Sequence, residues 1–546
     1  MESKILKGIV VLFVSILFLL CSISPLYSIQ NFWDDLDNDE LLDKIIDSMT
    51  DEELLGQVFI LGYMGSRPSP EIIEWILTKK IGGIKIFGWN AENLKDLTYS
   101  IRLMQNAALE SRLKIPLFVA TDQEGGWVRH VKGTTSITPG NLAIGATGLG
   151  YDAFLTGYYI GCELKALGIN MNFAPTVDVY TNPDAHVIGP RAFSDDAVKT
   201  ALLGVAYYKG LEKAGIISTA KHFPGHGNSD KDSHGTLPVI NTTFDELWNR
   251  ELVPYRFLIK EGLPAIMSGH LGFPKIIGDL TPASLSPFFL TDVLRKRLGF
   301  QGLLITDDLV MSGVYEPGMD LPKVAKKAIE AGNDMIMISR SPQTYQAAWE
   351  LLYSSMKREK AFKNKIVEAV RRIIAIKLKI IKKPDGVPII PDLNNVEENI
   401  PDKDGVKFFF DLACRSVTVI KDGMLPLSPR KMGKVLLAGQ YKQFIEAGLK
   451  YFPDADQYYF PYSPFYNARE EDLKSLRWLA GRYNTIIFCL SNLNSLEMLK
   501  ILKGTSADVI VLSTLTPIYL REVPWVQSAL AVYGVGADSF KAGFAA

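Results

Sequence analysis

The 546-residue chain has little cysteine, few histidines and no excess of charge of either sign. Its four cysteines, at 21, 162, 414 and 489, are widely spaced and form no CxxC pair. That spacing argues against a disulfide framework and against a zinc site built from several thiolates. The formal net charge is −1, so no chain-wide basic field exists to attract nucleic acid. We therefore expect neither a metal nor a nucleic-acid partner.

The chain also lacks a hydrophobic run of the about 20 residues that a membrane-spanning helix needs near its start. Lys4 and Lys7 precede a shorter apolar run, residues 9–21, as in a signal peptide. We expect residues 1–28 to be a signal peptide or an N-terminal anchor, and the protein to be exported to the periplasm, the envelope or the medium. Cleavage, lipid attachment at Cys21 and retention as an uncleaved anchor stay open.

The rest of the sequence has globular composition, with 47% hydrophobic and 22% charged residues, and its length favours two domains. Eight short apolar runs read as buried strands: 58–61, 83–87, 117–121, 170–173, 217–220, 265–268, 302–306 and 335–338. Helical periodicity separates them, for example in residues 93–112, 199–214, 245–261 and 321–331. Eight such units predict a (β/α)8 barrel over residues 29–383, with an open doubly wound sheet as the alternative.

A change in composition marks the end of this barrel. Prolines recur in residues 384–404, which we interpret as a linker. Five further runs predict buried strands in a smaller α/β sandwich domain over residues 405–546: 416–420, 435–438, 485–489, 509–512 and 529–533. The last residues, 540–546, contain no turn or charged tail, which suggests a truncated end.

The distribution of histidine places the chemistry in the barrel. All six histidines lie in the first domain, at 130, 186, 222, 226, 234 and 270. Polar motifs follow five adjacent predicted strands: 122–126, 172–175 with 188–191, 221–227, 268–270 and 306–309. Barrel enzymes carry their active groups on the loops after the strands, so these motifs predict one active site at the C-terminal end of the barrel.

Several of these segments resemble glycoside hydrolase family 3, in its β-N-acetylglucosaminidase (β-N-acetylhexosaminidase) branch. The segment KHFPGHGNSDKDSHGTLP (221–238) resembles the signature of that branch, whose closing Asp-x-His distinguishes it from the β-glucosidases of the family. The segment VLRKRLGFQGLLITDDLVM (293–311) resembles the nucleophile segment of the family. DQEGG, NFAPTVDVYTNP and VIGPRAF are further matches in the same order along the chain.

The resemblance implies that Asp307 is the catalytic nucleophile. Alternation along a strand prevents Asp307 and Asp308 from both facing the sugar easily, but it does not select between them, because residues 303–305 are all apolar. The resemblance selects the first Asp after Thr306. A carboxylate there can form a glycosyl–enzyme intermediate, while Asp308 caps the following helix.

The general acid and base implied by the resemblance is His234, oriented by Asp232. An imidazole with a pKa near about 6.5 can protonate a leaving oxygen and then activate water, and a neighbouring carboxylate raises its basicity. Gly225, Gly227 and Gly235 leave the segment conformationally free, which predicts that the pair lies on a mobile loop.

Four residues are implied to bind the terminal sugar: Asp122, Arg191, Lys221 and His222. A carboxylate accepts hydrogen bonds from sugar hydroxyls, and Lys and Arg donate them without losing their charge.

One position departs from the pattern of the family, which usually has Arg eight residues after the Asp of DQEGG. Here that position is His130, preceded by Arg129, so either the loop is shifted by one residue or a sugar contact is lost. We assign His226 and His270 to the structural shell of the pocket, and Met311 to its edge.

Four other readings compete with this one. A metal-dependent hydrolase would use His222 and His226 on one helical face, but Pro224 breaks a helix there. Substrate-assisted hydrolysis would use Asp307 and Asp308 and would leave the Asp232–His234 pair unexplained. Phosphorolysis suits a His acid and base, which does not repel phosphate. A non-catalytic wall-sugar-binding protein predicts damaged catalytic positions.

The sequence therefore predicts an exported, retaining exo-β-N-acetylglucosaminidase that needs no cofactor. Its expected substrates carry terminal β-linked GlcNAc, in peptidoglycan-derived fragments or chitooligosaccharides. The second domain has no histidine, so we assign it a structural role and leave open whether it touches the pocket. The oligomeric state stays open too.

Overall fold

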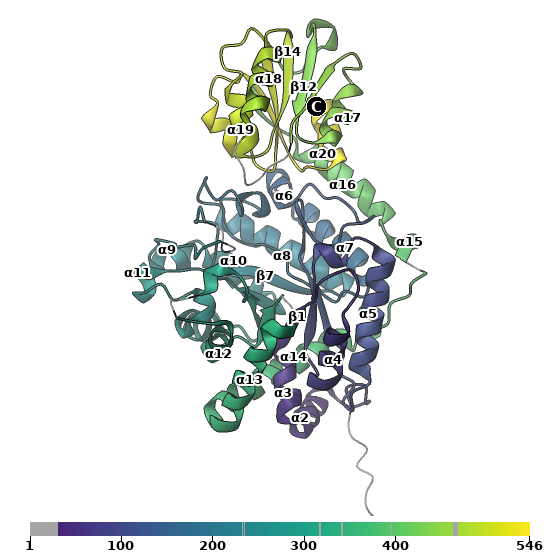
Figure 1. Ribbon diagram of the computed structural model, residues 1–546, viewed down its shortest axis with the longest axis vertical. Helices are drawn as coiled ribbons and strands as arrows, with labels where there is room; N and C mark the ends of the chain where they lie inside the picture. The colour runs from purple at the N-terminus through teal and green to yellow at the C-terminus, as the bar shows by residue number, and fades with distance from the viewer. Residues whose placement is uncertain are drawn as a thin grey trace, which may run out of the picture.

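The computed structural model describes residues 31–231, 233, 235–315, 318–339, 342–394, 396–461 and 468–546. The leader predicted in residues 1–28 and the predicted pair Asp232 and His234 lie outside these residues. Figure 1 shows two bodies, a barrel below and a smaller sheet domain above, joined by an extended connection and α16 (Lys403–Ser416). Within the described ranges, no helix has the length and apolar character needed to cross a membrane.

Eight parallel strands close into a barrel in the order β1-β10-β9-β8-β7-β6-β3-β2. Their bounds are β1 Phe59–Gly62, β2 Gly83–Ile86, β3 Phe118–Thr121, β6 Met171–Asn172, β7 Ile217–Phe223, β8 Ala265–Ser268, β9 Leu303–Asp308 and β10 Met335–Ile338. Each predicted strand segment overlaps one of them, so the (β/α)8 barrel is confirmed. Because β1 pairs with both β2 and β10, the alternative of an open sheet is wrong.

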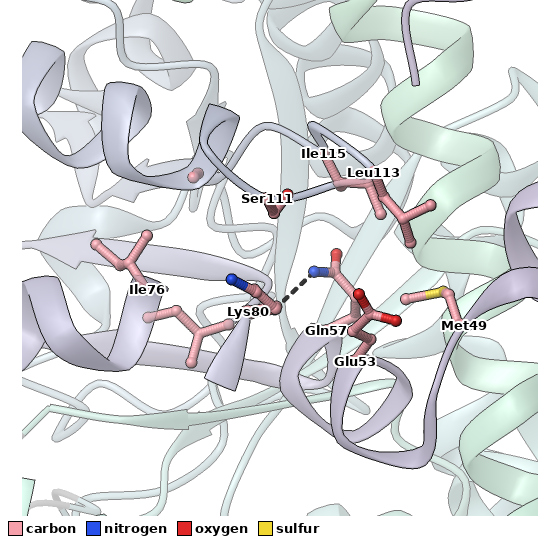
Figure 2. Close-up of a pocket in the computed structure, with 10 residues that line it drawn as sticks. Met49, Glu53, Gln57, Ile76, Lys80, Ser111, Leu113 and Ile115 are labelled. Carbon is pink, nitrogen blue, oxygen red and sulfur yellow. Dashed lines mark hydrogen bonds between the residues drawn. The ribbon is translucent and has the colours of Figure 1, made fainter. Parts of the chain in front are cut away.

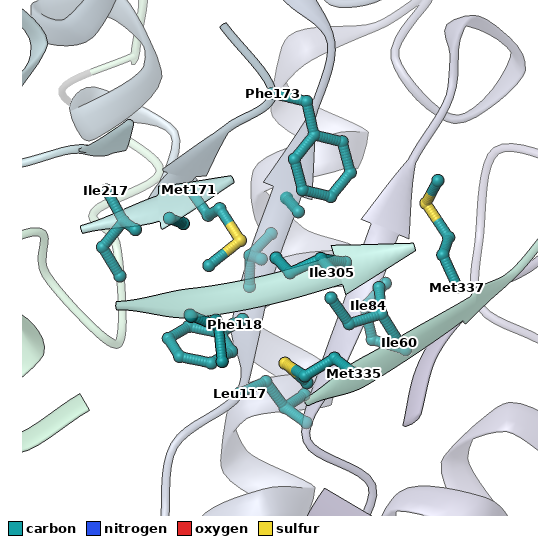
Figure 3. Packing of buried hydrophobic residues seen from close by; sticks show 14 of the residues in the cluster. Ile60, Ile84, Leu117, Phe118, Met171, Phe173, Ile217, Ile305, Met335 and Met337 are labelled. Atoms are coloured by element: carbon teal, nitrogen blue, oxygen red, sulfur yellow. The ribbon is translucent and has the colours of Figure 1, made fainter. Parts of the chain in front are cut away.

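The barrel interior is filled by apolar side chains from its own strands. Figure 3 shows Ile60, Ile84, Phe118, Met171 and Ile305 packed against one another, and each is fully buried. Such layers of branched and aromatic residues make the barrel a packed core, so chemistry is confined to the loops at its ends.

A small cavity lies near the N-terminal ends of β1 and β2, at the end of α3 (Asp51–Gln57). Figure 2 shows Gln57 donating a hydrogen bond to the Lys80 carbonyl there, at 2.8 Å. The cavity volume is about 10 Å³, room for about one water molecule. It lies away from the motifs at the C-terminal end of the barrel and is too small for a sugar.

Helices surround the barrel, and several begin at a residue whose side chain caps them. Thr50 and Glu53 form a capping box at α3, and the Asp320 carboxylate accepts from Lys323 N–H at the start of α12. The helices of this domain are α2 Asn38–Ser48, α4 Pro70–Lys79, α5 Leu94–Leu109, α6 Asn141–Thr147, α7 Gly150–Ala166, α8 Ala197–Ala214, α9 Phe244–Asn249, α10 Leu252–Lys260, α11 Pro274–Ile277, α12 Leu321–Ala331, α13 Pro342–Arg358 and α14 Lys360–Ile376.

Shorter elements shape the loops between these helices and strands. They are η1 Gly88–Asn90, the hairpin β4 Gln123–Gly125 and β5 Val128–Arg129, η2 Gly189–Arg191, η3 Ala283–Leu285, η4 Phe288–Arg297, η5 Ser312–Val314 and η6 Lys377–Ile381. The single helix predicted over residues 245–261 is wrong: α9 and α10 are separate because Arg250 leaves the helical region, with φ −130° and ψ −77°.

The second domain contains a six-stranded sheet in the order β11-β16-β15-β14-β12-β13, with β11 antiparallel to β16 and the rest parallel. Before it come α15 Val396–Asn399, which contacts α5 and α7 of the barrel, and α16. The elements of the domain are β11 Thr418–Asp422, η7 Pro429–Lys431, β12 Val435–Gly439, α17 Lys442–Leu449, β13 Asp456–Tyr459, α18 Glu470–Ala480, β14 Thr485–Leu490, α19 Leu493–Lys500, β15 Asp508–Thr514, η8 Pro517–Glu522, β16 Ser528–Tyr533 and α20 Ala537–Ala545.

Both edges of this sheet differ from the sequence prediction. The strand β13 was not predicted, because its sequence DQYY is largely exposed and has no apolar run. The strand β11 was predicted as buried, but Val419 is 56% exposed, as an edge strand allows. The inner strands β12, β14, β15 and β16 match their predicted segments because both of their faces are covered.

Candidate active site

The loops after β3 and β6, together with the ends of β7 and β9, gather charged side chains at the C-terminal end of the barrel. Five of the predicted site residues lie in one connected group there: Asp122, Arg191, Lys221, His222 and Asp307. The predicted acid and base, Asp232 and His234, lie outside the described residues.

Asp122 lies between two buried lysines. Its carboxylate oxygens accept hydrogen bonds from Lys221 Nζ and Lys85 Nζ, and these two lysines are only 2% and 1% exposed. Burial alone would raise the pKa of Asp122, but the two ammonium groups hold that pKa well below its ordinary value. Asp122 is therefore a fixed anion with both oxygens oriented.

Glu124 is a second buried carboxylate in the same hairpin. It accepts two hydrogen bonds from Arg191, at 2.8 Å from Nε and 2.7 Å from Nη2, and it lies 2.6 Å from Lys221 Nζ. Although burial opposes ionisation, Arg191 and Lys221 lower the pKa of Glu124 to about 2. This bidentate pair fixes the plane of the guanidinium group.

His222 is oriented by a third buried carboxylate, Asp178. The His222 Nδ1 atom lies 2.7 Å from Asp178 Oδ2, and its Nε2 lies 3.2 Å from Arg191 Nη2. Burial opposes the charge of Asp178, yet His222 lowers the pKa of that carboxylate to about 2. The pair fixes the imidazole ring beside the guanidinium group.

Lys221 and His222 are adjacent, yet both reach the same site. The register of β7 against β8 shifts between Ala220 and Phe223, which is a bulge in β7. A bulge interrupts the alternation of side chains and redirects one of them. This local irregularity brings the two side chains together.

His226 belongs to the supporting shell of the site, as its assignment from sequence states. Its backbone N–H donates to Asp178 Oδ1 at 2.6 Å, and burial lowers the pKa of its ring to about 4. The rings of His222 and His226 are 5.9 Å apart in a T-shaped arrangement. Among the described residues, no group of three or more His, Cys, Asp or Glu side chains could hold a metal ion.

Asp307 and Asp308 end β9 in different surroundings. Asp307 is partly exposed. Its partial burial raises the pKa of its carboxyl group, but His222, His270 and the Asp308 N–H lower that pKa by a larger amount, so the net shift is downward. The Asp308 carboxylate is buried, and its Oδ1 accepts from the backbone N–H groups of Val310 and Ser339, both at 3.2 Å. Asp307 is thus placed to meet a ligand, whereas Asp308 ties two loops together.

His270 contacts the backbone at the end of β9. Its Nε2 lies 3.1 Å from the Asp308 carbonyl oxygen, and its Nδ1 lies 2.7 Å from Ser284 Oγ. An Nε2–H tautomer would donate to that carbonyl, which leaves Nδ1 to accept from the Ser284 hydroxyl. This places His270 in the shell, where its assignment from sequence put it.

The structure distinguishes the two explanations for Arg129 and His130. Arg129 Nη1 donates to the carbonyl oxygens of Thr135 and Ser136, at 2.8 and 3.3 Å, and so binds its own loop. His130 Nδ1 lies 3.2 Å from Lys85 Nζ and 3.8 Å from Asp122 Oδ2. The loop is therefore not shifted, and a histidine occupies the position beside Asp122.

One described residue of the segment that follows β7, Ser233, forms a hydrogen bond with the backbone shortly after Asp307. Ser233, which lies between Asp232 and His234 in sequence, accepts a hydrogen bond from Gly313 N–H at 3.0 Å. Gly313 lies in η5, six residues after Asp307. A side chain at position 313 would lie 2.8 Å from the Ser233 carbonyl oxygen, so only glycine allows this approach.

This arrangement can bind a neutral, hydroxyl-rich ligand and attack it. Fixed carboxylates accept hydrogen bonds from hydroxyl groups, and Arg191 and Lys221 donate them. Asp307 is an ionised carboxylate that is partly accessible, as a nucleophile must be.

Comparison with known proteins identifies the family. Residues 49–376 match the model of the glycosyl hydrolase family 3 N terminal domain. The chain belongs to glycosyl hydrolase family 3. Beta-hexosaminidase A of Pseudoalteromonas piscicida is 32% identical over 424 residues, which cover 69% of this chain and 69% of that protein.

Solved structures of the family resemble both domains. A family 3 β-N-acetylglucosaminidase from a Paenibacillus species has a TM-score of 0.82 at 26% identity, covering 91% of this chain and 96% of that one. A fungal multi-domain family 3 β-N-acetylglucosaminidase has a TM-score of 0.82 at 28% identity; the match covers 91% of this chain but only 59% of the fungal chain. The resemblance stated from the motifs is confirmed, and this chain is a glycoside hydrolase.

Three charged residues of this family 3 hydrolase were missed by the sequence analysis: Lys85, Glu124 and Asp178. Glu124 lies inside DQEGG and Asp178 inside NFAPTVDVYTNP. Both residues therefore belong to recognised motifs, but neither had been assigned a role. Lys85 had one available signal, a lone lysine in the predicted buried strand 83–87. A buried lysine needs an anion, and that anion is Asp122.

Proposed function

We propose that this family 3 hydrolase is a retaining, exo-acting β-N-acetylglucosaminidase. It would release terminal β-linked GlcNAc from peptidoglycan-derived fragments or chitooligosaccharides. The observation that carries the proposal is the position of Asp307, an ionised and partly exposed carboxylate near His222 and Lys221. The printed names of the relatives, beta-hexosaminidase and β-N-acetylglucosaminidase, support the choice of sugar.

In the first step, an Asp307 oxygen attacks the anomeric carbon and forms an ester bond to it. The bond from that carbon to the leaving oxygen breaks, and His234 gives this oxygen a proton. In the second step, water attacks the anomeric carbon, gives a proton to His234 and displaces Asp307. Asp232 would keep the imidazole of His234 oriented and basic.

The terminal sugar would be held by the paired charges around Asp122. Because Lys85 and Lys221 fix this carboxylate, it is oriented before any sugar binds. Arg191 is fixed in the same way by Glu124. Groups that are oriented in advance lose little conformational entropy when a ligand arrives, which favours tight binding of one terminal residue.

The deciding experiment compares hydrolysis of an aryl β-GlcNAc and the matching aryl β-glucoside by the wild type, Asp307→Ala and His234→Ala. We expect the wild type to prefer GlcNAc strongly and Asp307→Ala to lose at least about 10³-fold in kcat. His234→Ala should lose less on an aryl leaving group, which needs little protonation, than on chitobiose. A wild type that ignores GlcNAc, or an active Asp307→Ala, would overturn the proposal.

Hydrolysis and phosphorolysis are separated by repeating the assay with and without inorganic phosphate. The proposal expects free GlcNAc in both buffers, and GlcNAc 1-phosphate in the presence of phosphate would identify a phosphorylase instead. We further propose export of the enzyme, because residues 1–28 have the pattern of a signal peptide or anchor. Fractionation of the cells that produce it should then place activity outside the cytoplasm.

A further inference from the structure

The second domain contacts the loop that carries Arg191, the connection between β6 and α8. Tyr180 of this loop lies beside Thr516 of the second domain, and both residues line one cleft between the domains. The Tyr180 ring lies against Gly189, where an added Cβ would be 2.3 Å from the ring. Gly189 begins the turn η2, which ends at Arg191. The Tyr180 ring therefore contacts the same short turn that carries the guanidinium group.

A second contact lies farther along the same loop. The rings of His186 and Tyr519 stack with centroids 5.2 Å apart and planes at 26°. Arg521 of the same short helix, η8, forms an ion pair with Asp184, in which both side chains are about half exposed. Exposed ion pairs contribute little, so the aromatic stack is the stronger constraint.

The turn that carries Arg191 is also held from its other side. Asn141 Nδ2 donates to the Arg191 carbonyl oxygen at 2.8 Å, and Asn141 begins α6. The next residues of α6 pack against the second domain: Ala143 shares a buried apolar cluster with Ala531 and Tyr533 of β16. Figure 1 shows α6 directly beneath the second domain.

Between these contacts the two domains are separated by a cleft of about 790 Å³. Tyr180 and Pro183 line it from the barrel, and Thr516, Leu520 and Arg521 line it from the second domain. The loop is therefore not embedded in a continuous interface. It is held at a few discrete points, so the loss of one contact leaves open space rather than a neighbouring group that could replace it.

The opposite face of the loop packs against the segment that follows β7. Asn182 N–H donates to the Gly227 carbonyl oxygen at 3.2 Å. A Cβ at Gly227 would lie 1.9 Å from the Val179 carbonyl oxygen, so this glycine serves close packing rather than the conformational freedom expected from the sequence. Any movement of the loop is consequently transmitted to both Arg191 and His226.

We infer that the second domain positions Arg191 for sugar binding through Thr516 and Tyr519, which act on the β6–α8 loop. The inference rests on the proposed function, in which Arg191 binds the terminal sugar. Thr516 and Tyr519 are positioning residues, since they touch the loop and not the site. A displacement of a binding group by about 1 Å is enough to weaken its hydrogen bonds.

The test compares Tyr519→Ala, Tyr519→Phe and Thr516→Val with Trp478→Ala, an equally drastic change at a 60% exposed position on α18. The readouts are KM and kcat on an aryl β-GlcNAc, and the inhibition constant of GlcNAc. We expect Tyr519→Ala and Thr516→Val to raise KM and the inhibition constant about fivefold, which corresponds to roughly 1 kcal/mol. Tyr519→Phe keeps the stacked ring and should restore values near the wild type.

A double-variant cycle shows whether Tyr519 acts through Arg191. In an Arg191→Lys background, Tyr519→Ala should change the GlcNAc inhibition constant much less than it does in the wild type. Equal effects in both backgrounds, or values for Tyr519→Ala equal to those of Trp478→Ala, would overturn the inference. A wild type that neither hydrolyses aryl β-GlcNAc nor binds GlcNAc would instead overturn the proposed function, so the two failures are distinguishable.

Discussion

Asp307 and Asp308 are neighbours in sequence at the end of β9, yet their carboxyl groups are shifted in opposite directions. Burial raises the pKa of Asp308 to about 6, while the positive charges near Asp307 and a backbone N–H keep its pKa below the ordinary value in spite of burial. One carboxyl supports the loops after β9 and β10, and the other is partly exposed at the site.

The first prediction concerns the stability of Asp308→Asn. A raised pKa means that the folded state holds a proton between about pH 4 and pH 6 that the unfolded state has released. This contribution to stability is present below about pH 4 and is lost as the pH rises through 6. Asn keeps an oxygen for the N–H groups of Val310 and Ser339. Above pH 6, we expect the free energy of unfolding of the variant to exceed that of the wild type by about 3 kcal/mol, measured by chemical denaturation.

The matched control is Asp307→Asn, for which the sign is reversed. The lowered pKa of Asp307 gives a contribution that is present above its ordinary pKa and is lost on acidification. This variant should therefore be less stable than the wild type at neutral pH, with the difference shrinking as the pH falls. A difference between Asp308→Asn and the wild type that stays constant from pH 4 to pH 7 would contradict the first prediction.

The second prediction concerns Glu124→Gln. The change removes the charge that Arg191 and Lys221 share, which leaves three buried cations, Arg191, Lys221 and Lys85, against the one carboxylate of Asp122. Breaking a buried ion pair in this way costs about 3–5 kcal/mol, and Arg191 loses its bidentate partner. We expect a lower melting temperature and a KM for aryl β-GlcNAc raised at least about tenfold. Glu212→Gln, an exposed change on α8, is the control, and equal KM values for the two variants would refute the role of Glu124.

The third prediction concerns Asp178→Asn. An amide oxygen at Oδ1 can still accept from the backbone N–H of His226, but an NH₂ group in place of Oδ2 no longer accepts from His222 Nδ1. The ring would change tautomer and lose its orientation beside Arg191. We expect kcat/KM to fall about 10²-fold or more, together with a lower stability at neutral pH, because the lowered pKa of Asp178 contributes stability there. Asp195→Asn, on the surface of the same loop, should have no effect; a similar loss there would point to a general disturbance of the loop.

The fourth prediction concerns Lys377, a fully buried lysine at the N-terminal end of the barrel. Its Nζ donates to Gln57 Oε1 and the Gly82 carbonyl, both at 2.9 Å, and lies 4.7 Å from the centre of the Phe118 ring. Burial holds the pKa of Lys377 well below its ordinary value, so the unfolded state binds the proton more tightly. The stability of the wild type relative to Lys377→Met should therefore rise between pH 7 and pH 10, by up to about 1.4 kcal/mol per pH unit.

Lys379→Met is the matched control, because Lys379 is exposed on the same helical turn. The loss of two hydrogen bonds in Lys377→Met adds a constant term, so the slope with pH, not the absolute difference, carries the prediction. Parallel curves for the wild type and Lys377→Met would show that Lys377 is charged in the folded protein.

The barrel could be predicted from the sequence because each of its strands is buried on both faces. Segments such as 58–61 and 335–338 are then continuous apolar runs that need no tertiary information. The strands β11 and β13 could not be read in the same way, because an edge strand exposes one side. Helix breaks such as the one at Arg250 depend on packing rather than on propensity, so no local pattern predicts a break at that residue.

The sequence predicts which loops form the site, but it does not predict which side chains form ion pairs within it. Asp122 and Lys221 were expected at the same end of the barrel because each comes at the C-terminal end of a predicted strand. Their partners Lys85 and Glu124 are defined by distances across the barrel, which no spacing in the chain encodes. The contact of His130 with Lys85 was also undetermined, because His130 departs from the pattern of the family and the choice between Arg129 and His130 stayed open.

The filled interior of the barrel has a consequence for the kinetics. Because Phe118 and Met171 occupy the space beneath the site, the strands offer a bound sugar no exit toward the N-terminal end of the barrel. Under the proposed exo-acting function, substrate, both products and water would all pass the C-terminal end of the barrel. The part of the substrate nearer that end would depart first, and the monosaccharide would leave last. Free monosaccharide should then compete with incoming substrate, so the rate of the enzyme should fall as the concentration of free monosaccharide rises.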